Sequence, residues 1–365
     1  MASFDEVLKD CTKLGTKIPT SEYLENGKYP IIDQGQNDIA GYYDSDDGLF
    51  EDVPTIVFGD HTRVVKYVDK PCFLGADGVK LLCPLDKDIN CKYLFYQLSC
   101  ADIPNTGYNR HFKWVKALDF KIPSSDEQNH VVEVLDKVTE LISLRKQQLA
   151  KLDELVKARF VEMFGDLVVG DKIQTSKKKI GEIASVTKLA GFEFTKYIQY
   201  KEHGDIIMLR GLNCKQGKLI LDDVKWIDRE TSDLLPRSKL YYGDILMTYA
   251  GTIGDVAMVD ENDKYHLAPN VAKVSINNKK AYNPIFLMYL FLYSNDYIMK
   301  FASQVAQASI NMEKIRNFEY YFPDVTFQNQ FATFVERVDQ QKQTVQQSLE
   351  KLELMKKALM QEFFG

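Results

Sequence analysis

Residues 123–165 read PSSDEQNHVVEVLDKVTELISLRKQQLAKLDELVKARFVEMFG, and residues 323–365 read PDVTFQNQFATFVERVDQQKQTVQQSLEKLELMKKALMQEFFG. A shift of 200 residues superimposes the two segments without a gap. Identical residues recur along the whole alignment, including Pro123 and Pro323, Gln128-Asn129 and Gln328-Asn329, Lys151-Leu152 and Lys351-Leu352, and Phe164-Gly165 and Phe364-Gly365. Chance does not explain so long an ungapped match, so the chain contains an internal duplication.

Both segments have the pattern of one long helix. Neither contains an internal Gly or Pro, and each ends at a glycine, a common helix stop. Apolar residues recur every seven positions, which is typical of a coiled-coil seam. The predicted seam positions are Leu135, Ile142, Leu149 and Val156 in the first copy, and Val338, Val345, Leu352 and Leu359 in the second.

A seam of this kind also occurs in coils that join separate chains. Two copies in one chain favour pairing with each other, and an antiparallel pair is expected because a whole globular unit separates them. A helix of about 39 residues would span about 58 Å.

The regions between the helices also correspond, since each contains a strand-rich stretch followed by a helix that begins at an asparagine. Asn90 and Asn283 are the predicted N-caps, and Pro284 suits the first helical position. The fold class is therefore mixed α+β: two α/β globules and two long helices in a pseudo-two-fold tandem repeat. The predicted domains are a first globule at 1–125, a first helix at 126–165, a second globule at 166–323 and a second helix at 324–365.

Composition indicates a folded protein of two or three domains. The 365 residues are 45% hydrophobic, and no apolar run is long enough for a membrane span. The start MASFDEVLKDCTKLG does not resemble a secretory signal. Six scattered cysteines without a CxxC pair favour reduced thiols and a cytoplasmic location. No cofactor or metal site is expected, because cysteine and histidine do not occur at ligand spacing.

The net charge of −6 is unusual for a nucleic-acid binder, but it is unevenly distributed. Residues 1–52 carry −8, whereas residues 53–125 carry +3 and residues 166–323 carry +2. The affinity that phosphate neutralisation supplies should therefore be modest for this chain alone. A partner is expected to supply much of the binding.

Three motifs suggest catalysis, but each has a simpler explanation. Asn283-Pro284-Ile285-Phe286 is similar to the loop with which amino-methyltransferases hold adenine, yet the first copy has Asn90-Cys91-Lys92-Tyr93, and a helix cap explains both. Residues 251–254, GTIG, lack the Gly-Lys-Ser/Thr of a P-loop and suit a turn between strands. Asp60 and His61 have no nucleophile pattern beside them.

Polar and aromatic side chains that suit DNA contact gather in predicted loops of each globule. Residues 108–114, YNRHFKW, interleave basic, amide and aromatic groups, and their counterpart in the second globule is QASINMEK at 307–314. A plain surface turn is the alternative for each stretch. Candidate contacts are His61, Arg63, Lys66, Tyr108, Asn109, Arg110, His111 and Lys113 in the first globule, and Arg210, Asn213, Lys215, Thr248, Tyr249, Thr252, Ser309, Asn311 and Lys314 in the second.

With these features together, the chain resembles the specificity subunits of type I restriction-modification systems. The resemblance covers nearly the whole chain and includes GKYPIIDQGQNDIAGYYD, FGDHTRVVKYVD, GYNRHFKW, YYGDILMTYAGTIGD and Glu127-Gln128 at the first helix. Phe327 departs from the usual Glu-Gln pair in the second copy.

The resemblance implies that each globule reads half of a bipartite double-stranded DNA site and that the helices set the spacer between the halves. It also implies that two modification (methyltransferase) subunits and further restriction subunits dock on a chain that is not itself an enzyme. A catalytic methyltransferase or nuclease, and a coiled-coil scaffold unrelated to DNA, are the alternatives. Cofactor binding by the isolated chain would favour the first, and DNA binding indifferent to Arg110→Ala and His61→Ala would favour the second.

Overall fold

The structure is a computed structural model that describes residues 1–75, 78–173, 175–303 and 308–365. It divides into two compact units. Unit 1 comprises residues 1–148 and 345–365, and unit 2 comprises residues 149–344. Each unit therefore contains one globule together with the first part of one long helix and the last part of the other.

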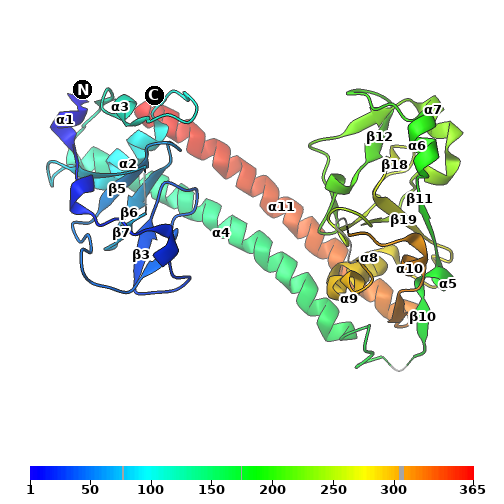
Figure 1. Ribbon diagram of the computed structural model, residues 1–365. Coiled ribbons are helices and arrows are strands. Elements are labelled where there is room, and N and C mark those ends of the chain that lie inside the picture. Colours follow the sequence, from blue (N-terminus) through cyan, green and yellow to red (C-terminus); the bar gives the residue numbers. More distant parts are fainter. Residues whose placement is uncertain (76–77, 174, 304–307) are drawn as a thin grey trace. The chain divides into compact units, whose positions relative to one another are not determined.

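The two long helices are α4 (Ser125–Phe164) and α11 (Val325–Phe364), each of 40 residues. Figure 1 draws them in green and in orange to red. The amide of Gln128 donates to the carbonyl of Ser124 at the start of α4, and the Asp324 side chain accepts from the amide of Thr326 at the start of α11. Gly165 ends α4 with a φ of 64°, which glycine adopts readily. The presence of two long helices, as the sequence predicts, is confirmed.

Within each unit, the two helix parts run antiparallel. In unit 1, Arg145 Nε donates to Ser348 Oγ over 3.2 Å, while Leu135 near the start of α4 shares a core with Leu359 near the end of α11. In unit 2, Lys342 Nζ lies 2.6 Å from Asp153 Oδ1, and the rings of Phe164 and Phe331 are 5.7 Å apart. In both units, residues with increasing numbers in α4 contact residues with decreasing numbers in α11. This is the antiparallel arrangement that the sequence predicts.

The eight predicted seam positions are all buried or half-buried. Leu135, Val156, Val338 and Val345 are buried, and Ile142, Leu149, Leu352 and Leu359 are half-buried. Exposed large apolar side chains also lie on the helices, and these are Leu141, Leu144, Leu354 and Met355 in unit 1, and Leu155, Val161 and Phe327 in unit 2.

The globule of unit 1 contains a four-stranded sheet in the order β2-β8-β5-β6 and a three-stranded sheet in the order β4-β3-β7. The neighbours in these sheets are antiparallel except β3 and β7. A short pair joins β1 to β9. The strands are β1 (Ala2–Ser3), β2 (Leu8–Asp10), β3 (Tyr29–Ile32), β4 (Gly41–Tyr43), β5 (Thr55–Gly59), β6 (Val65–Val68), β7 (Phe73–Leu74), β8 (Val79–Pro84) and β9 (Asp119–Phe120). The helices are α1 (Phe4–Val7), α2 (Cys91–Cys100) and α3 (Phe112–Val115), with 3-10 turns at Thr12–Leu14 and Thr20–Glu22.

The globule of unit 2 repeats this plan with the orders β11-β19-β16-β17 and β15-β12-β18 and the pair β10-β20. It adds the hairpin β13-β14. The strands are β10 (Lys177–Lys179), β11 (Ala184–Lys188), β12 (Ile206–Leu209), β13 (Cys214–Lys215), β14 (Lys218–Leu219), β15 (Lys225–Ile227), β16 (Ile245–Thr248), β17 (Val256–Met258), β18 (Tyr265–Leu267), β19 (Val271–Ile276) and β20 (Glu319–Tyr321). The helices are α5 (Ile180–Ile183), α6 (Gly191–Tyr197), α7 (Arg229–Leu234), α8 (Pro284–Tyr293), α9 (Asn295–Met299) and α10 (Met312–Arg316), with 3-10 turns at Gly211–Asn213 and Pro236–Ser238. The corresponding sheet orders confirm the tandem repeat and the mixed α+β class.

One polar connection ties each globule to its long helix in the same way. In unit 1, Gln128 Oε1 accepts from the amide of Asn90 over 2.9 Å, and Gln128 Nε2 donates to the carbonyl of Pro123 over 2.9 Å. The corresponding distances for Gln328 with Asn283 and Pro323 are 3.0 and 2.8 Å. Both glutamines are buried.

The asparagine side chains then cap α2 and α8. Asn90 Oδ1 accepts from the amides of Lys92 and Tyr93, and Asn283 Oδ1 accepts from those of Ile285 and Phe286. Both predicted N-caps are confirmed, so residues 283–286 begin a helix as their counterparts do in unit 1.

Candidate nucleic-acid interface

In unit 1, the turn between β5 and β6 is fastened to the loop that precedes α3. The carbonyl of Asp60 accepts from the amide of His111 over 2.8 Å and lies 2.9 Å from His111 Nδ1. Asp60 Oδ1 accepts from the amide of Phe112 over 2.7 Å. A carbonyl oxygen only accepts, so we assign the imidazole proton to Nδ1, which leaves Nε2 to accept from Thr106. Asp60 is thus a structural anchor rather than a catalytic partner of His61.

The tip of this turn carries two of the predicted contact residues. Arg63 has a φ of 63°, and its Nη1 donates to the carbonyl of Ile103 over 3.0 Å. The His61 ring stacks on the ring of Tyr108 with centroids 4.6 Å apart and an interplanar angle of 8°. Tyr108 is 88% exposed, so the turn and the loop together present a supported aromatic ring to solvent.

Other basic side chains surround α3. Arg110 and Lys113 are exposed, and Lys113 Nζ lies 5.2 Å from the centre of the Trp114 ring. Lys80 Nζ and Lys116 Nζ lie 4.7 and 5.6 Å from the centre of the Phe112 ring. Sequence reasoning missed Lys80 and Lys116. The proximity of Lys116 to Lys113 in the chain was a usable signal, whereas only the pairing of β5 with β8 brings Lys80 close.

In unit 2, the equivalent turn between β16 and β17 is fastened in the same way. The carbonyl of Tyr249 accepts from the amide of Ile310 over 2.9 Å, just as that of Asp60 accepts from His111. Gly251 and Gly254 have φ values of 83° and 85°, which bring the turn back over itself. Thr252 is exposed at its tip.

The loop on the other side of this turn holds three further candidates of unit 2, Ser309, Asn311 and Lys314. Asn311 caps α10 by accepting from the amide of Lys314 over 2.9 Å, and Lys314 Nζ donates to the carbonyl of Phe301 over 2.7 Å. Ser309 forms a bridge with Ala250 and is half-buried. Gln307, the first residue of the predicted stretch, lies outside the described residues.

A second polar group lies beside this turn, after β12. Arg210 Nη2 lies 2.8 Å from Asp223 Oδ1, and Asn213 Oδ1 accepts from the amide of Arg210 over 3.0 Å. Arg210 is therefore already engaged in an ion pair. Lys215 is exposed on the β13-β14 hairpin.

The structure buries four of the predicted contact residues. Lys66 is held by Asp33 and the carbonyl of Asn37, and His111 by Asp60, as described above. Asn213 and Thr248 bond to neighbouring backbone within their own turns. The exposed fractions are 5% for Lys66 and 0% for His111, Asn213 and Thr248. These four buried side chains stabilise the loops through hydrogen bonds and an ion pair. We do not include them among the proposed contacts.

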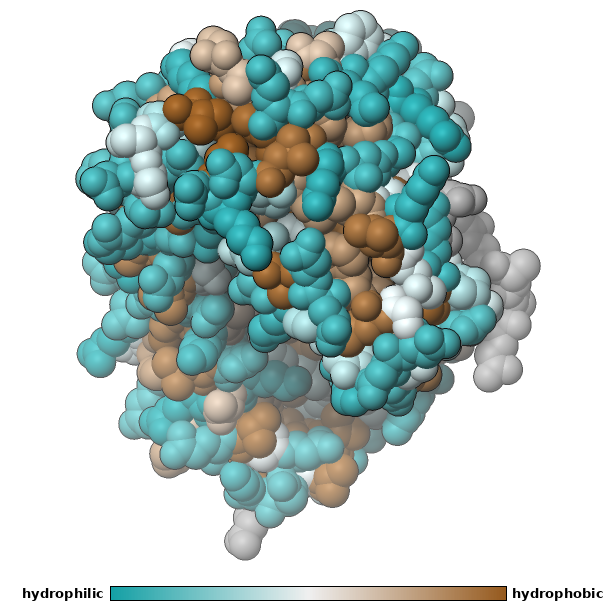
Figure 2. All heavy atoms as spheres, turned by 90° about the vertical axis from the view of Figure 1, so that its left-hand side faces the viewer, coloured by the Kyte–Doolittle hydropathy of each residue, from teal (hydrophilic) through white to brown (hydrophobic). Residues whose placement is uncertain are grey.

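The predicted residues that remain at the surface lie around the β5-β6 turn and α3 in unit 1, and around the β16-β17 turn, α10 and the segment after β12 in unit 2. Figure 2 shows that hydrophilic side chains cover most of the face in view, with apolar side chains in separate areas.

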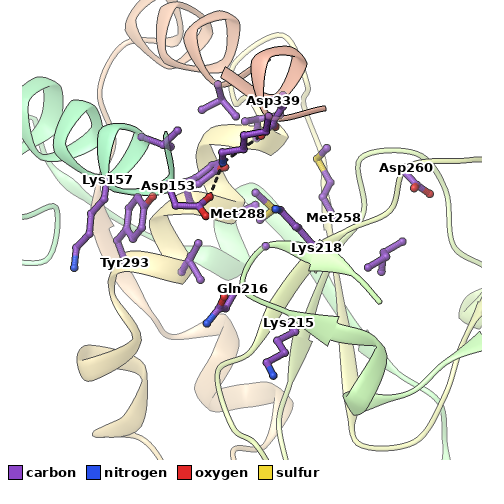
Figure 3. A pocket seen from close by; sticks show the side chains of 18 of the residues that line it. Asp153, Lys157, Lys215, Gln216, Lys218, Met258, Asp260, Met288, Tyr293 and Asp339 are labelled. Carbon is purple, nitrogen blue, oxygen red and sulfur yellow. Dashed lines mark ion pairs between the residues drawn. The ribbon is translucent and has the colours of Figure 1, made fainter. Parts of the chain in front are cut away.

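The hairpin of unit 2 also borders a pocket of about 860 Å³. Its apolar floor includes Met258, Met288 and Tyr293, and Lys342 pairs with Asp153 and Asp339 at one side (Figure 3). Counted from the cap asparagines, Lys92 and Phe95 of unit 1 correspond to Ile285 and Met288 of unit 2. Phe95 lies against Tyr67, with ring centroids 5.9 Å apart. The two copies thus share the same helix and cap, but the side chains at the positions that border the pocket in unit 2 differ in unit 1.

Among the described residues, no group of three or more His, Cys, Asp or Glu side chains is placed to hold a metal ion. The described helices also include none long and apolar enough to cross a membrane.

Comparisons with known proteins agree with the repeated plan. The family described as the type I restriction modification DNA specificity domain matches residues 5–154 and 174–354. The chain is 25% identical over 242 residues to the type I restriction enzyme EcoBI specificity subunit of Escherichia coli, which covers 60% of this chain and 50% of that protein. The chain thus spans about half the length of this curated relative.

Solved structures show the same fold. The S subunit of a type I restriction-modification system from M. genitalium is similar with a TM-score of 0.59 and 17% identity, over 100% of this chain and 95% of that one. A structure concerned with complex assembly and conformational transition of the type I R-M system gives a TM-score of 0.57 and 13% identity, over 98% and 94%. With the family match covering both copies, the chain belongs to the type I restriction-modification DNA specificity family.

Proposed function

We propose that this chain is the DNA specificity subunit of a type I restriction-modification complex and reads a bipartite target, one half with each unit. The observation that carries this proposal is the repeated anchor of the candidate interface. The carbonyl of Asp60 in unit 1 and that of Tyr249 in unit 2 accept the equivalent backbone bond, from His111 and Ile310. The side chains on these two frames differ, with His61 and an arginine in the first turn and Ala250 and a threonine in the second. A shared backbone arrangement that carries different surface side chains in each unit suits the reading of two different half-sites.

The proposed contacts are the exposed or half-exposed candidates. Arginine and asparagine can pair with base edges, and lysine can neutralise phosphates. In unit 1 they are His61, Arg63, Tyr108, Asn109, Arg110 and Lys113, and in unit 2 Arg210, Lys215, Tyr249, Thr252, Ser309, Asn311 and Lys314.

The long helices would fix the spacer between the half-sites. At 1.5 Å per residue, a 40-residue helix is about 60 Å long. Half-site spacing also sets rotational phase, because DNA turns once in about 10.5 base pairs. Inserting one heptad into both α4 and α11 should lengthen the preferred spacer. An unchanged spacer would show that the long helices do not set the distance between the half-sites.

The same helices offer a docking surface for partner subunits. Leu141, Leu144, Leu354 and Met355 are 43%, 48%, 69% and 49% exposed, whereas the seam residues beside them, Ile142 and Leu352, are half-buried. We propose that two methyltransferase subunits dock on such surfaces, that restriction subunits join them, and that the chain itself is non-catalytic. Partner binding would also compensate for the net charge of −6.

The proposal is tested by purifying the chain with its methyltransferase subunit and mapping the bases that the complex modifies. Methylated adenines in two half-sites at a fixed spacing are the expected result. A stable complex without sequence-selective modification would favour a scaffold unrelated to DNA. Binding of S-adenosylmethionine by the chain alone would favour an enzyme.

A further inference from the structure

The stacked pair of His61 and Tyr108 lies at the surface of unit 1. A tyrosine ring that is 88% exposed normally contributes little to stability. Here it lies parallel to an imidazole ring at 4.6 Å, so the imidazole supports one side of the ring while most of its surface stays accessible. A flat aromatic surface of this kind matches the face of a nucleobase.

Hydrogen bonds anchor both of the segments that carry this pair. The amide of His61 donates to Gln34 Oε1 over 3.2 Å, and the Arg63 side chain ties the turn to the carbonyl of Ile103. On the other side, the buried His111 fastens the loop three residues beyond Tyr108 to Asp60. These bonds fix the turn and the end of the loop, which lowers the conformational entropy that is lost when the Tyr108 ring meets a ligand.

The position of the imidazole indicates that it supports the tyrosine ring. His61 Nδ1 is buried and makes no hydrogen bond with any described residue. The stack on Tyr108 is thus a contact of the ring that does not depend on a hydrogen bond at this nitrogen. His61 is a positioning residue in this arrangement, and Tyr108 is the residue that faces a partner.

In the described part of unit 2, the position that corresponds to His61 carries no ring. Since Asp60 corresponds to Tyr249 through the shared backbone bond, His61 corresponds to Ala250, which has no ring. The stacked pair can therefore act only on the part of a ligand that unit 1 meets.

From this geometry we infer that Tyr108, supported by His61, inserts as an aromatic wedge at a base step of the half-site read by unit 1 and stacks its ring on a base. This inference rests on the proposed function. Apolar and aromatic wedges unstack a base step and favour steps that deform easily, so Tyr108 would contribute specificity without a hydrogen bond to a base edge.

The test uses the complex of the full chain with its methyltransferase subunit and its mapped target duplex. 2-Aminopurine replaces one base at a time in each half-site, and its fluorescence on binding reports unstacking. We expect one position in one half-site to brighten with the wild-type chain and to lose that change in Tyr108→Ala. A base that the methyltransferase turns out of the helix brightens in both proteins, which identifies it.

Affinity measurements with matched variants separate the two roles. Tyr108→Ala should weaken binding about tenfold, as the loss of one base–aromatic stack predicts, and Tyr108→Phe should stay within about twofold. His61→Ala should weaken binding about threefold, an intermediate loss since only the support is removed, and His61→Phe should restore it because the stack is retained. Tyr242→Ala, at a 51% exposed tyrosine of unit 2, is the control and should leave unit 1's half-site unchanged.

The outcomes distinguish this inference from the proposed function. If the wild-type complex selects no bipartite site, the proposed function fails. If it selects one but Tyr108→Ala binds and brightens like the wild type, only the wedge fails. Equal losses in Tyr108→Ala and Tyr108→Phe would assign the effect to the phenol hydroxyl and overturn stacking. Unchanged melting temperatures of the Tyr108 variants would show that the fold is intact.

Discussion

The two buried glutamines at the start of the long helices offer a matched pair of perturbations. Gln128→Ala removes two hydrogen bonds in unit 1, to Asn90 and Pro123, and Gln328→Ala removes the equivalent two in unit 2. A hydrogen bond contributes about 1 kcal/mol net, and a buried backbone group left without a partner adds about 1 kcal/mol or more. Each variant should therefore lower the free energy of unfolding by about 2–4 kcal/mol.

Urea denaturation followed by far-ultraviolet circular dichroism measures these losses. The matched control is Gln147→Ala, at an exposed glutamine in the middle of α4, which should change stability by less than about 0.5 kcal/mol. The double variant should show the sum of the two losses, because the sites lie in different units and share no partner. Losses in both glutamine variants no larger than in the control would refute the view that this connection holds each globule to its helix.

Three further predictions follow from buried groups. Phe160→Ala should destabilise unit 2 by about 3–5 kcal/mol in the same assay, since Phe160 packs against four aromatic rings, whereas Leu155→Ala at a 46% exposed position should have little effect. Cys100 is half-buried while the other five cysteines are buried, and burial raises the pKa of the Cys214 thiol to about 12. An aromatic disulfide reagent at mildly alkaline pH should therefore react first with one thiol, and Cys100→Ser should abolish that phase. Burial lowers the pKa of His266 below its usual value of 6.5, so the unfolded chain takes up this proton first. The stability associated with this residue is present above pH 6.5 and declines as the pH falls below it, and His266→Gln should make the acid side of the stability profile less steep.

The periodic and duplicated parts of the fold were predictable from the sequence. The ungapped shift of 200 residues defines both long helices, and Asn90 and Asn283 mark the starts of α2 and α8. These features are local, because heptad spacing and N-cap chemistry depend on residues within a few turns of each other.

Features that depend on distant residues were not predictable in this way. Lys66 and Arg63 are both basic residues of one short stretch, yet Asp33 holds the first inside while the second lies at the turn. His111 and Tyr108 are three residues apart, and only the anchor at Asp60 buries one and exposes the other. Sequence spacing identifies such residues as candidates, but long-range pairing decides which of them reach the surface.

The central claim, that the two units read two halves of one DNA target, is tested most directly by mapping the modification pattern of the complex with its methyltransferase subunit. The account predicts methylated adenines in two distinct half-sites at one fixed spacing, with Arg110→Ala relaxing selection in only one of them. Modification of a single undivided site, or selection that Arg110→Ala alters equally in both halves, would contradict it.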